Sequence, residues 1–589
     1  MKQVSEAYRT SMSQLFRNRS YVRVQIQNLD KTIASDSHWQ DTGNHETFSE
    51  FDTLNSDSVY GKGYATLELN RWSLDGSWDI TSGNIRNDGY ISSELSDSTG
   101  ALAEEVELIR SHEYPHDMSG VTVTFDSRAD ESPVEATINF YAVDTLVATL
   151  DVKEQETCKY TELYPMTGID RVTITPHTLL PYRRFRLEKL LFGVALEYTD
   201  ENLISLTQSH DVDPICRRLP DERLDFTIID FEHNYDADNP QGIYQYVLAK
   251  TPVSVTYGYE LDDGSIEWLQ PDTYLLDSKP SAKNDRVTFS AKGLVNMLTG
   301  SYYKSMHGGK NLYDMAVEVL EDANLDRTET GENPWKIDES LRTMLTTTAL
   351  PIDTHANCLQ RIAHAARCRL YTDNRNVIHI DPVSYEINNG DFYMDFNSIG
   401  ENSLVSTKID ELQAVSVVQY KNTVSNNISD VYSEDTDLEN LHIEIPNAVK
   451  DMTVTVTGGT VLSQQVYARA VDLVMTSGTK HVTLSGKVVE QTTATIDMQV
   501  SHTGEIDLEQ NPLITSGSMR QALARHVAEY LQYRNTYEMT YRGNPELETG
   551  DTIMIQTRYT TKMPALVLKD EITYNGALGG AVIVKGLIK

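Results

Sequence analysis

The chain has 589 residues, of which 39% are hydrophobic, and at about 150 residues per domain it is long enough for roughly four domains. It contains no run of about 18 apolar residues and no apolar stretch among its first ten residues, so we expect neither a membrane span nor a secretory signal, and we expect synthesis in a cytoplasm. Its 50 basic and 87 acidic residues give a net charge of −37, which argues against stable nucleic-acid binding because phosphate contacts need clusters of Lys and Arg.

The first segment, 1–63, is expected to hold a helix, a strand and a surface loop. Four apolar residues recur at helical spacing and predict one buried helix face, namely Tyr8, Met12, Leu15 and Phe16. Alternating Val and Ile at 21–27 predict a strand, and the polar stretch 30–58 is typical of a loop that crosses a surface.

The next segment, 64–198, is predicted to form a jelly-roll-like β-sandwich. Short alternating strands follow one another at regular spacing and are separated by turns rich in Gly, Asn, Asp and Pro. Five rings are candidate glycan contacts because they are suited to stack on a sugar: Trp72, Trp78, Tyr90, Tyr114 and His116. The alternative is that the two tryptophans belong to the sandwich core.

Residues 199–301 are predicted to form a first antiparallel barrel. The segment 251–259 alternates Val and Tyr on one face, which predicts a half-buried strand. A second alternating segment, 287–291, is interpreted as its partner strand. Residues 236–242 are rich in Asp, Asn, Pro and Gly and predict a turn.

An α/β connector is expected at 302–401. Apolar stripes at 312–320 and 359–366 predict two amphipathic helices. The sequence at 368–380 predicts a hairpin whose turn is 373–376.

The remaining residues are predicted to form a second barrel around an inserted β-region. Segment 402–536 is expected to contain the start of that barrel, the insertion and a helix at 518–532. Segment 537–589 carries the C-terminal part of the barrel. Its turn signals separate four predicted strands, 537–541, 552–557, 564–573 and 580–586.

Catalytic signatures are scarce. The sequence has no G-x-S-x-G, G-x-x-x-x-G-K-[ST] or C-x-x-C motif. The letters HEYPH at 112–116 match a zinc-protease motif, but Pro115 opposes the helix that such a site needs, and a loop is the alternative. Two His/Cys pairs at 355–368 fall on opposite faces of a straight helix, and the acidic residues at 230–239 are typical of turns. We therefore predict no catalytic residue, no metal and no cofactor.

Segments far apart in the chain resemble one family. The phrase P-x-L-x-x-G-D-x-I at 545–553 precedes a strand and N-G-x-x-G at 575–579, and the segment 219–298 runs from LPDERLDF to LVNML. Both resemble bacteriophage tail hub and baseplate hub proteins, which include the N-terminal part of siphophage tail-associated lysins. The flanks of the predicted sandwich, YATLELNRW and PYRRFRLEKL, resemble the carbohydrate-binding-like module near the front of many phage tail-tip proteins.

The resemblance implies a structural virion protein of the tail tip, without enzymatic activity, that serves host attachment and genome ejection. It implies a homotrimer in which two hub-type barrels per chain match a six-fold tube. The implied partners are the tail tube or distal tail protein, the tape measure protein and tail fibre or receptor-binding proteins, with a host cell-wall glycan as a candidate ligand of the sandwich. Because tail-associated lysins continue beyond the second barrel, we expect no lysin in this chain.

A DNA passage, implied by the same resemblance, predicts a neutral to acidic lumen. Five acidic residues at turns of the two barrels are candidates for its rim: Asp262, Asp263, Glu546, Glu548 and Asp551. Ordinary solvated turns are the alternative. Two other functions remain open at this point, a carbohydrate-binding adhesin and a glycoside hydrolase with ancillary β-domains, since paired carboxylates are also what glycoside hydrolysis requires.

Overall fold

The computed structural model describes residues 1–29, 37–42, 45–46, 54, 68, 89–104, 106–126, 131–153, 158–231, 233–239, 243–244, 247–306, 308–325, 333–383, 392–400, 408–409, 414–498, 505–507 and 511–587. Strands make up 51% and helices 12%, which confirms the predicted multidomain fold that is mainly β with some α. In this described part, no helix has the length and apolar character needed to cross a membrane.

The chain divides into two compact units, which are described separately. The first unit comprises Met1–Val24, Tyr198–Glu232 and Val253–Lys589, and the second comprises Gln25–Glu197 and His233–Pro252.

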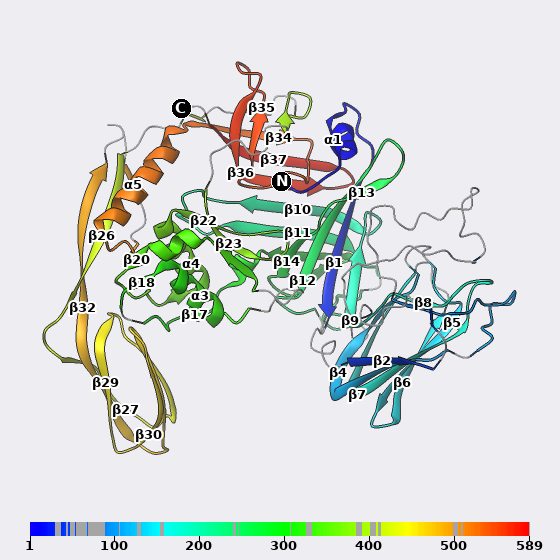
Figure 1. Ribbon diagram of the computed structural model, residues 1–589, viewed down its shortest axis with the longest axis horizontal. Helices are drawn as coiled ribbons and strands as arrows, with labels where there is room; N and C mark the ends of the chain where they lie inside the picture. The colour runs from blue at the N-terminus through cyan, green and yellow to red at the C-terminus, as the bar shows by residue number, and fades with distance from the viewer. Residues whose placement is uncertain are drawn as a thin grey trace. The chain divides into compact units, whose positions relative to one another are not determined.

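The first unit contains an antiparallel barrel built around β10 and β11 (Figure 1). Its strands are β1 (Ser20–Leu29), β10 (Leu203–Asp211), β11 (Asp221–Ile229), β12 (Pro252–Glu260), β13 (Ile266–Trp268), β14 (Asp272–Leu276), β15 (Ser281–Lys283) and β16 (Arg286–Lys292). The predicted faces at 251–259 and 287–291 are buried as expected. Their predicted partnership is wrong, because β14 lies between β12 and β16 and pairs with both, while β11 takes the other edge of β16.

A second barrel follows at the C-terminal end of the chain. Its strands are β24 (Tyr393–Met394), β25 (Lys408–Ile409), β34 (Asn535–Tyr541), β35 (Thr552–Ile555), β36 (Met563–Tyr574) and β37 (Leu578–Gly586), in the order β24-β35-β36-β37-β34-β25. All four strands predicted for 537–589 are therefore confirmed. Gly543, Gly550 and Gly576 have φ of 60°, 86° and 98°, a region that favours glycine and explains why these turns fall where they do.

Two α-helices of the connector share one core with a third α-helix, which follows the insertion. They are α3 (Leu312–Asp322), α4 (His355–Ala366) and α5 (Gly517–Gln532), which confirms the predicted helices, and each begins after a side-chain N-cap. The short elements around them are η2 (Leu294–Met297), β17 (Ser301–Tyr302), β18 (Lys310–Asn311), β19 (Trp335–Ile337), η3 (Glu339–Thr343), β20 (Leu345–Thr346), β21 (Asp353–Thr354), β22 (Cys368–Thr372) and β23 (Ile378–Pro382). The predicted hairpin is β22–β23, with its turn at 373–376.

The insertion is a small β-module at the end of a long hairpin (Figure 1). The hairpin strands are β26 (Ala414–Val424) and β32 (Lys480–Met498), and the other strands are β27 (Ser429–Thr436), β28 (Asn440–Glu444), β29 (Val449–Thr457), β30 (Val461–Val466), β31 (Ala470–Met475) and β33 (Glu505–Asp507). The module has a hydrophobic core of its own, centred on Val471, Leu473, Val482 and Leu484.

The second unit is built on long, bent strands. They are β2 (Ser37–Asp41), β3 (Tyr90–Ile91), β4 (Leu108–Thr124), β5 (Glu135–Ala142), β6 (Thr145–Lys153), β7 (Lys159–Thr178), β8 (Arg186–Leu187) and β9 (Lys189–Tyr198). Strand β4 pairs with β7 along most of its length, with register shifts between Ser111 and Gly120. Such bulges bend a strand, so the HEYPH segment lies at the bend of β4 and not in a loop.

Helix α1 (Glu6–Ser13) ends earlier than its apolar spacing predicts. Tyr8 and Met12 are buried, but Leu15 and Phe16 lie beyond the helix end and are 65% and 85% exposed. The predicted common face is therefore wrong for these two residues. The chain turns away there because the Arg17 side chain donates to the Met12 carbonyl, and this bond occupies the end of the helix.

Candidate functional site at the junction of the two barrels

Strand β10 joins the two barrels into one hydrogen-bonded sheet. One edge of β10 pairs with β11 of the first barrel. The other edge pairs with β36 of the second barrel, from Leu206 opposite Tyr574 to Asp211 opposite Lys569. Because a continuous ladder fixes strand spacing and register, the two barrels are held at a defined separation.

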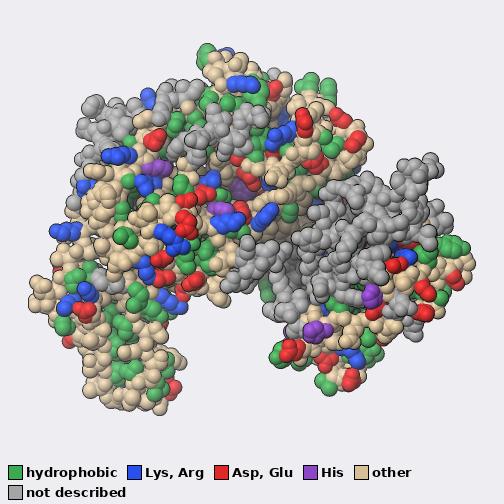
Figure 2. Space-filling view, in the orientation of Figure 1, with side chains coloured by type: hydrophobic (Ala, Val, Ile, Leu, Met, Phe, Trp, Pro, Cys, Tyr) green, Lys and Arg blue, Asp and Glu red, His purple; other side chains and the backbone are tan. Residues whose placement is uncertain are grey.

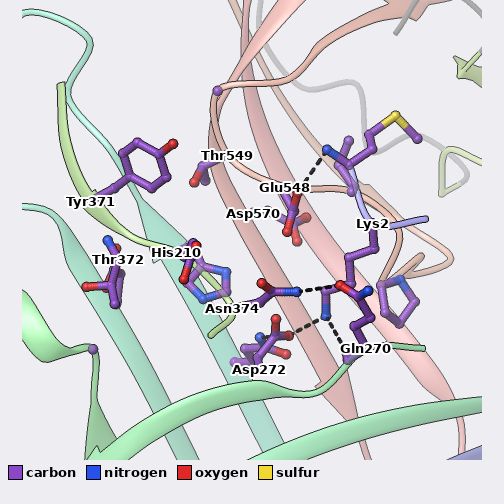
Figure 3. A pocket seen from close by; sticks show the side chains of 18 of the residues that line it. Lys2, His210, Gln270, Asp272, Tyr371, Thr372, Asn374, Glu548, Thr549 and Asp570 are labelled. Atoms are coloured by element: carbon purple, nitrogen blue, oxygen red, sulfur yellow. Dashed lines mark hydrogen bonds and ion pairs between the residues drawn. The ribbon is translucent and has the colours of Figure 1, made fainter. Parts of the chain in front are cut away.

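A polar cavity of about 450 Å³ opens beside this seam. Its walls come from the N-terminal residues, β10, the start of β14, the β22–β23 hairpin, the turn at 545–551 and β36 (Figure 3). In Figure 2, acidic, basic and histidine side chains gather on this face of the first unit, near β10 and β22.

Lys2 and Asp272 begin a chain of buried contacts along one wall. The Lys2 ammonium donates to the Asp272 carboxylate at 2.6 Å and to the Gln270 carbonyl at 3.2 Å. The Gln208 amide donates to the same carboxylate at 2.6 Å. The Tyr257 hydroxyl donates to the side-chain oxygen Oε1 of Gln208 at 2.5 Å. A buried charge costs free energy unless it is paired and hydrogen-bonded. The contacts of Lys2 and Asp272 provide both the pairing and the hydrogen bonds.

Asp570 and His210 face each other across the seam. They are direct register partners on β36 and β10. The Tyr541 hydroxyl donates to Asp570 at 2.7 Å, and Tyr274 shares a 2.5 Å hydrogen bond with His210. Desolvation raises the pKa of Asp570 to about 7 despite the opposing effect of Tyr541 and Lys2, and desolvation lowers the pKa of His210. Both groups are therefore pushed toward their neutral forms.

Glu222 also lines the cavity, and on β11 it is the register partner of His210. Its carboxylate accepts from the Thr372 backbone N–H at 2.8 Å, and burial raises its pKa to about 7. Gly293 leaves room for this side chain, since a Cβ at Gly293 would overlap the Glu222 carboxylate and lie 2.8 Å from the Glu222 Cβ.

The N-terminal segment bridges the two barrels. The Lys2 N–H donates to the Glu546 carbonyl, Tyr8 donates to the Asn544 side chain at 2.9 Å, and Arg9 contacts the Glu546 carboxylate at 2.6 Å. On the other side, Tyr8 packs edge-to-face on Tyr259 of the first barrel. We call residues 1–19 the strap, because they are attached to both barrels.

The predicted rim residues divide into two groups. Glu546 and Asp551 are 1% and 6% exposed. Glu546 pairs with Arg9, and Asp551, with Glu548, pairs with the Met1 amino group at 2.8 Å. Desolvation raises the pKa of both Glu546 and Asp551. They therefore belong to the junction, where the turn at 544–551 packs on the strap. Asp262 and Asp263 lie exposed in the β12–β13 turn.

The predicted glycan contacts are also dispersed. Trp72 and Trp78 lie outside the described residues. Tyr90 is fully buried in the core of the second unit, where it packs on Phe185, so its ring is not accessible to a sugar. Tyr114 is 62% exposed on β4, and His116, in the same bent segment, packs edge-to-face on His112 at 5.2 Å.

The described residues contain no group of three or more His, Cys, Asp or Glu side chains placed to hold a metal ion. Within the 355–368 cluster, His355 bonds to Gly300 and Asp322, while His364 bonds to Asn511. The two histidines of this cluster therefore have different partners, and Cys368 belongs to β22, after the end of α4. The cavity's charged groups likewise bind one another, which suits them to hold elements together.

The junction residues missed by sequence reasoning have a common signature. Glu222 and Asp570 occupy inward positions of alternating strands whose other inward residues are apolar. A carboxylate at such a position must be paired or neutral. An acidic residue at an inward position of an alternating strand is therefore a signal that the sequence alone could have given. Lys2 carries no comparable local signal, because its partner Asp272 is 270 residues away.

No family model matches the chain. No curated protein matches it by sequence. Solved structures with a similar arrangement include a tail protein from Neisseria meningitidis, at 10% identity and a TM-score of 0.34, covering 67% of this chain and 93% of that chain. The prophage tail protein gp18 from Listeria monocytogenes matches at 8% identity and a TM-score of 0.35, covering 67% and 92%. A third match is the E. coli c3393 protein, at 10% identity and a TM-score of 0.31, covering 66% of this chain and 74% of that chain. That protein is described as a component of the type VI secretion system with structural similarity to the T4 bacteriophage tail proteins gp27 and gp5.

Proposed function

We propose that this chain is a structural hub of a phage tail tip or a related particle, which closes the tail tube and links it to the receptor-binding apparatus. The observation that carries the proposal is the β10–β36 seam, which joins two barrels of one chain in one hydrogen-bonded sheet. The sequence resemblance of both barrels to tail hubs supports it independently. Its partners are then further copies of itself, the tail tube or distal tail protein, the tape measure protein and the tail fibre or receptor-binding proteins.

Paired barrels suit the transition from a six-fold tube to a three-fold tip. Three chains present six barrels, and a fixed spacing within each pair is needed for those six to match six tube subunits. The β10–β36 ladder supplies that spacing, and the strap reinforces it through its contacts with both barrels.

A structural role agrees with the chemistry of the junction. Lys2, Asp272, Glu546 and Arg9 neutralise one another within the protein. Such closed pairs hold domains together, whereas acid–base catalysis needs a group within reach of a substrate. The net charge of −37 suits a passage for DNA, because an acidic wall releases no counterions from a passing duplex and does not retain it.

The mass of the purified protein in solution tests this proposal. Light scattering coupled to gel filtration is expected to give three times the 66.4 kDa of one chain, and electron micrographs should show a three-fold ring. A protein that stays monomeric over a wide range of concentrations, or six equivalent copies at one level of a particle, would contradict the proposal.

Glycan contact by the second unit is a second proposal, which the exposure of Tyr114 favours. Aromatic rings exposed on a β-sheet suit stacking on sugars. Tyr114→Ala should weaken binding to cell-wall glycans without unfolding the unit, and Tyr164→Ala, which removes another exposed tyrosine of this unit at 43% exposure, is the matched control. Equal binding by both variants and the unchanged protein would refute the role of Tyr114, and release of sugar products would favour the glycosidase alternative.

A further inference from the structure

Two exposed apolar patches lie on the first unit, and we define each by its residues. The first, the knob, is Leu15 and Phe16 beyond the end of α1, at 65% and 85% exposure. The second, the aromatic patch, is Tyr393, Phe396 and Tyr559, at 36%, 50% and 90% exposure. In Figure 2, hydrophobic side chains appear at two separate places on the upper edge, near α1 and above β35.

Acidic side chains border the knob. Asp262 accepts hydrogen bonds from Gln14 at 3.0 Å and Asn18 at 3.3 Å, the two residues that flank the knob and its neighbour Arg17. Asp263 is next to it, and both carboxylates are exposed. The Arg17 guanidinium points inward and donates to the carbonyls of residues 542 and 543. Arg19, three residues after Phe16, is exposed but is paired with Asp200, so the carboxylates of Asp262 and Asp263 are the unneutralised exposed charges described beside the knob.

Basic side chains border the aromatic patch. Tyr393 donates to the Thr561 carbonyl at 2.7 Å, and the Phe396 N–H donates to Gln556 at 3.0 Å, so the segment at 392–398 and the loop at 556–562 form one surface. Lys562 lies 5.6 Å from the centre of the Tyr393 ring, and both Lys562 and Arg558 are exposed. The accessible charge within this loop is therefore positive.

We propose that the knob of one copy of this chain binds the aromatic patch of the next copy, with Asp262 and Asp263 against Arg558 and Lys562. The two patches are complementary in charge and are both apolar at their centres, which favours a second copy as the partner. The contact joins two different surfaces, so it is heterologous and generates a ring when its rotation closes. The proposed contact does not itself set the number of copies in the ring, and for that number the inference rests on the proposed function.

The size of the patches suits the centre of a larger interface. A well-buried aromatic side chain covers about 150–250 Å², and a stable interface needs about 1,000 Å² or more. Phe16 and Tyr559 therefore act as anchors, which typically dominate the binding energy, and their truncation should weaken assembly at least about tenfold.

Sedimentation of purified variants tests the contact. Phe16→Ser and Tyr559→Ser should each give monomers at concentrations where the unchanged protein assembles. Phe231→Ser is the matched control, because Phe231 is 75% exposed on the same unit outside both patches, and it should assemble normally. Assembly of both patch variants at the unchanged strength overturns the inference while leaving the proposed hub intact.

A mixing experiment separates direct contact from misfolding. The Phe16→Ser chain keeps its aromatic patch, and the Tyr559→Ser chain keeps its knob, so an equimolar mixture should form 1:1 dimers that cannot close into a ring. A mixture that stays monomeric overturns the heterologous contact. If the unchanged protein itself remains monomeric at every concentration, both the contact and the proposed hub fail.

Discussion

Asp570 gives the strongest test of the junction, because its substitution by Asn should change how stability depends on pH. Burial raises the pKa of Asp570 from 3.8 to about 7, so the folded protein binds this proton more tightly than the unfolded chain. Stability from this group is therefore greatest below about pH 4, falls as pH rises, and is level above about pH 7. The slope is about 1.4 kcal/mol per pH unit, and the total is about 4 kcal/mol.

Asp570→Asn keeps an oxygen that accepts from Tyr541 but removes the titration. The free energy of unfolding of this variant should lose that slope between about pH 4 and pH 7 and run parallel to the unchanged protein above it. The measurement is hydrogen exchange of peptides from β10 and β36 at increasing urea, with the exchange rates corrected for the effect of pH on intrinsic exchange. Because these peptides come from the barrels, the free energy of unfolding obtained in this way refers to the barrels and not to the rest of the chain. Glu571→Gln, which removes a neighbouring carboxylate paired with Lys569, is the control. Parallel curves for Asp570→Asn and the unchanged protein at all pH values would refute the reasoning.

Three further predictions concern the strap, the cavity and the charge. Arg9→Met should destabilise the protein by about 1–3 kcal/mol, because Glu546 is 1% exposed and would lose its ion-pair partner; adding Glu546→Gln should recover stability in thermal melts, and no recovery would speak against the pair. Gly293→Ala should cost about 1–3 kcal/mol through overlap with Glu222, and an unchanged melting temperature would contradict this. Gel shifts at low salt should show no duplex DNA retention, and salt-sensitive retention would count against an acidic passage.

The C-terminal barrel could be predicted from the sequence because local chemistry determines its turns. Glycines at 543, 550 and 576 adopt positive φ, and they mark the ends of strands such as β34, in which buried and exposed residues alternate from Tyr537 to Tyr541. The hairpin at 368–380 was predictable for the same reason, since Asn376 also adopts positive φ in its turn.

The junction could not be predicted because its contacts join residues far apart in sequence. Glu546 is part of a polar turn that looks solvated in the sequence, but it is buried and bonds to Arg9 of the strap, which lies more than 500 residues earlier. Strand order failed in the first barrel in the same way. The short strand β14 has only five residues, and its presence between β12 and β16 follows from three-dimensional closure, which periodicity does not encode.

Asp262 and Asp263 have two proposed roles, as part of a channel rim or as part of a contact between copies, and the two roles predict different results for the same substitution. Replacing both by Lys should separate them. At a rim, the change leaves assembly intact and creates a basic lumen, so duplex DNA should be retained in a salt-dependent manner. At the contact, the change sets like charges opposite Arg558 and Lys562, so assembly weakens and adding Arg558→Glu and Lys562→Glu restores it. We expect the second result, because Asp262 bonds to Gln14 and Asn18, which flank Leu15 and Phe16 in sequence, and an exposed apolar pair is better suited to a protein neighbour than to a water-filled passage.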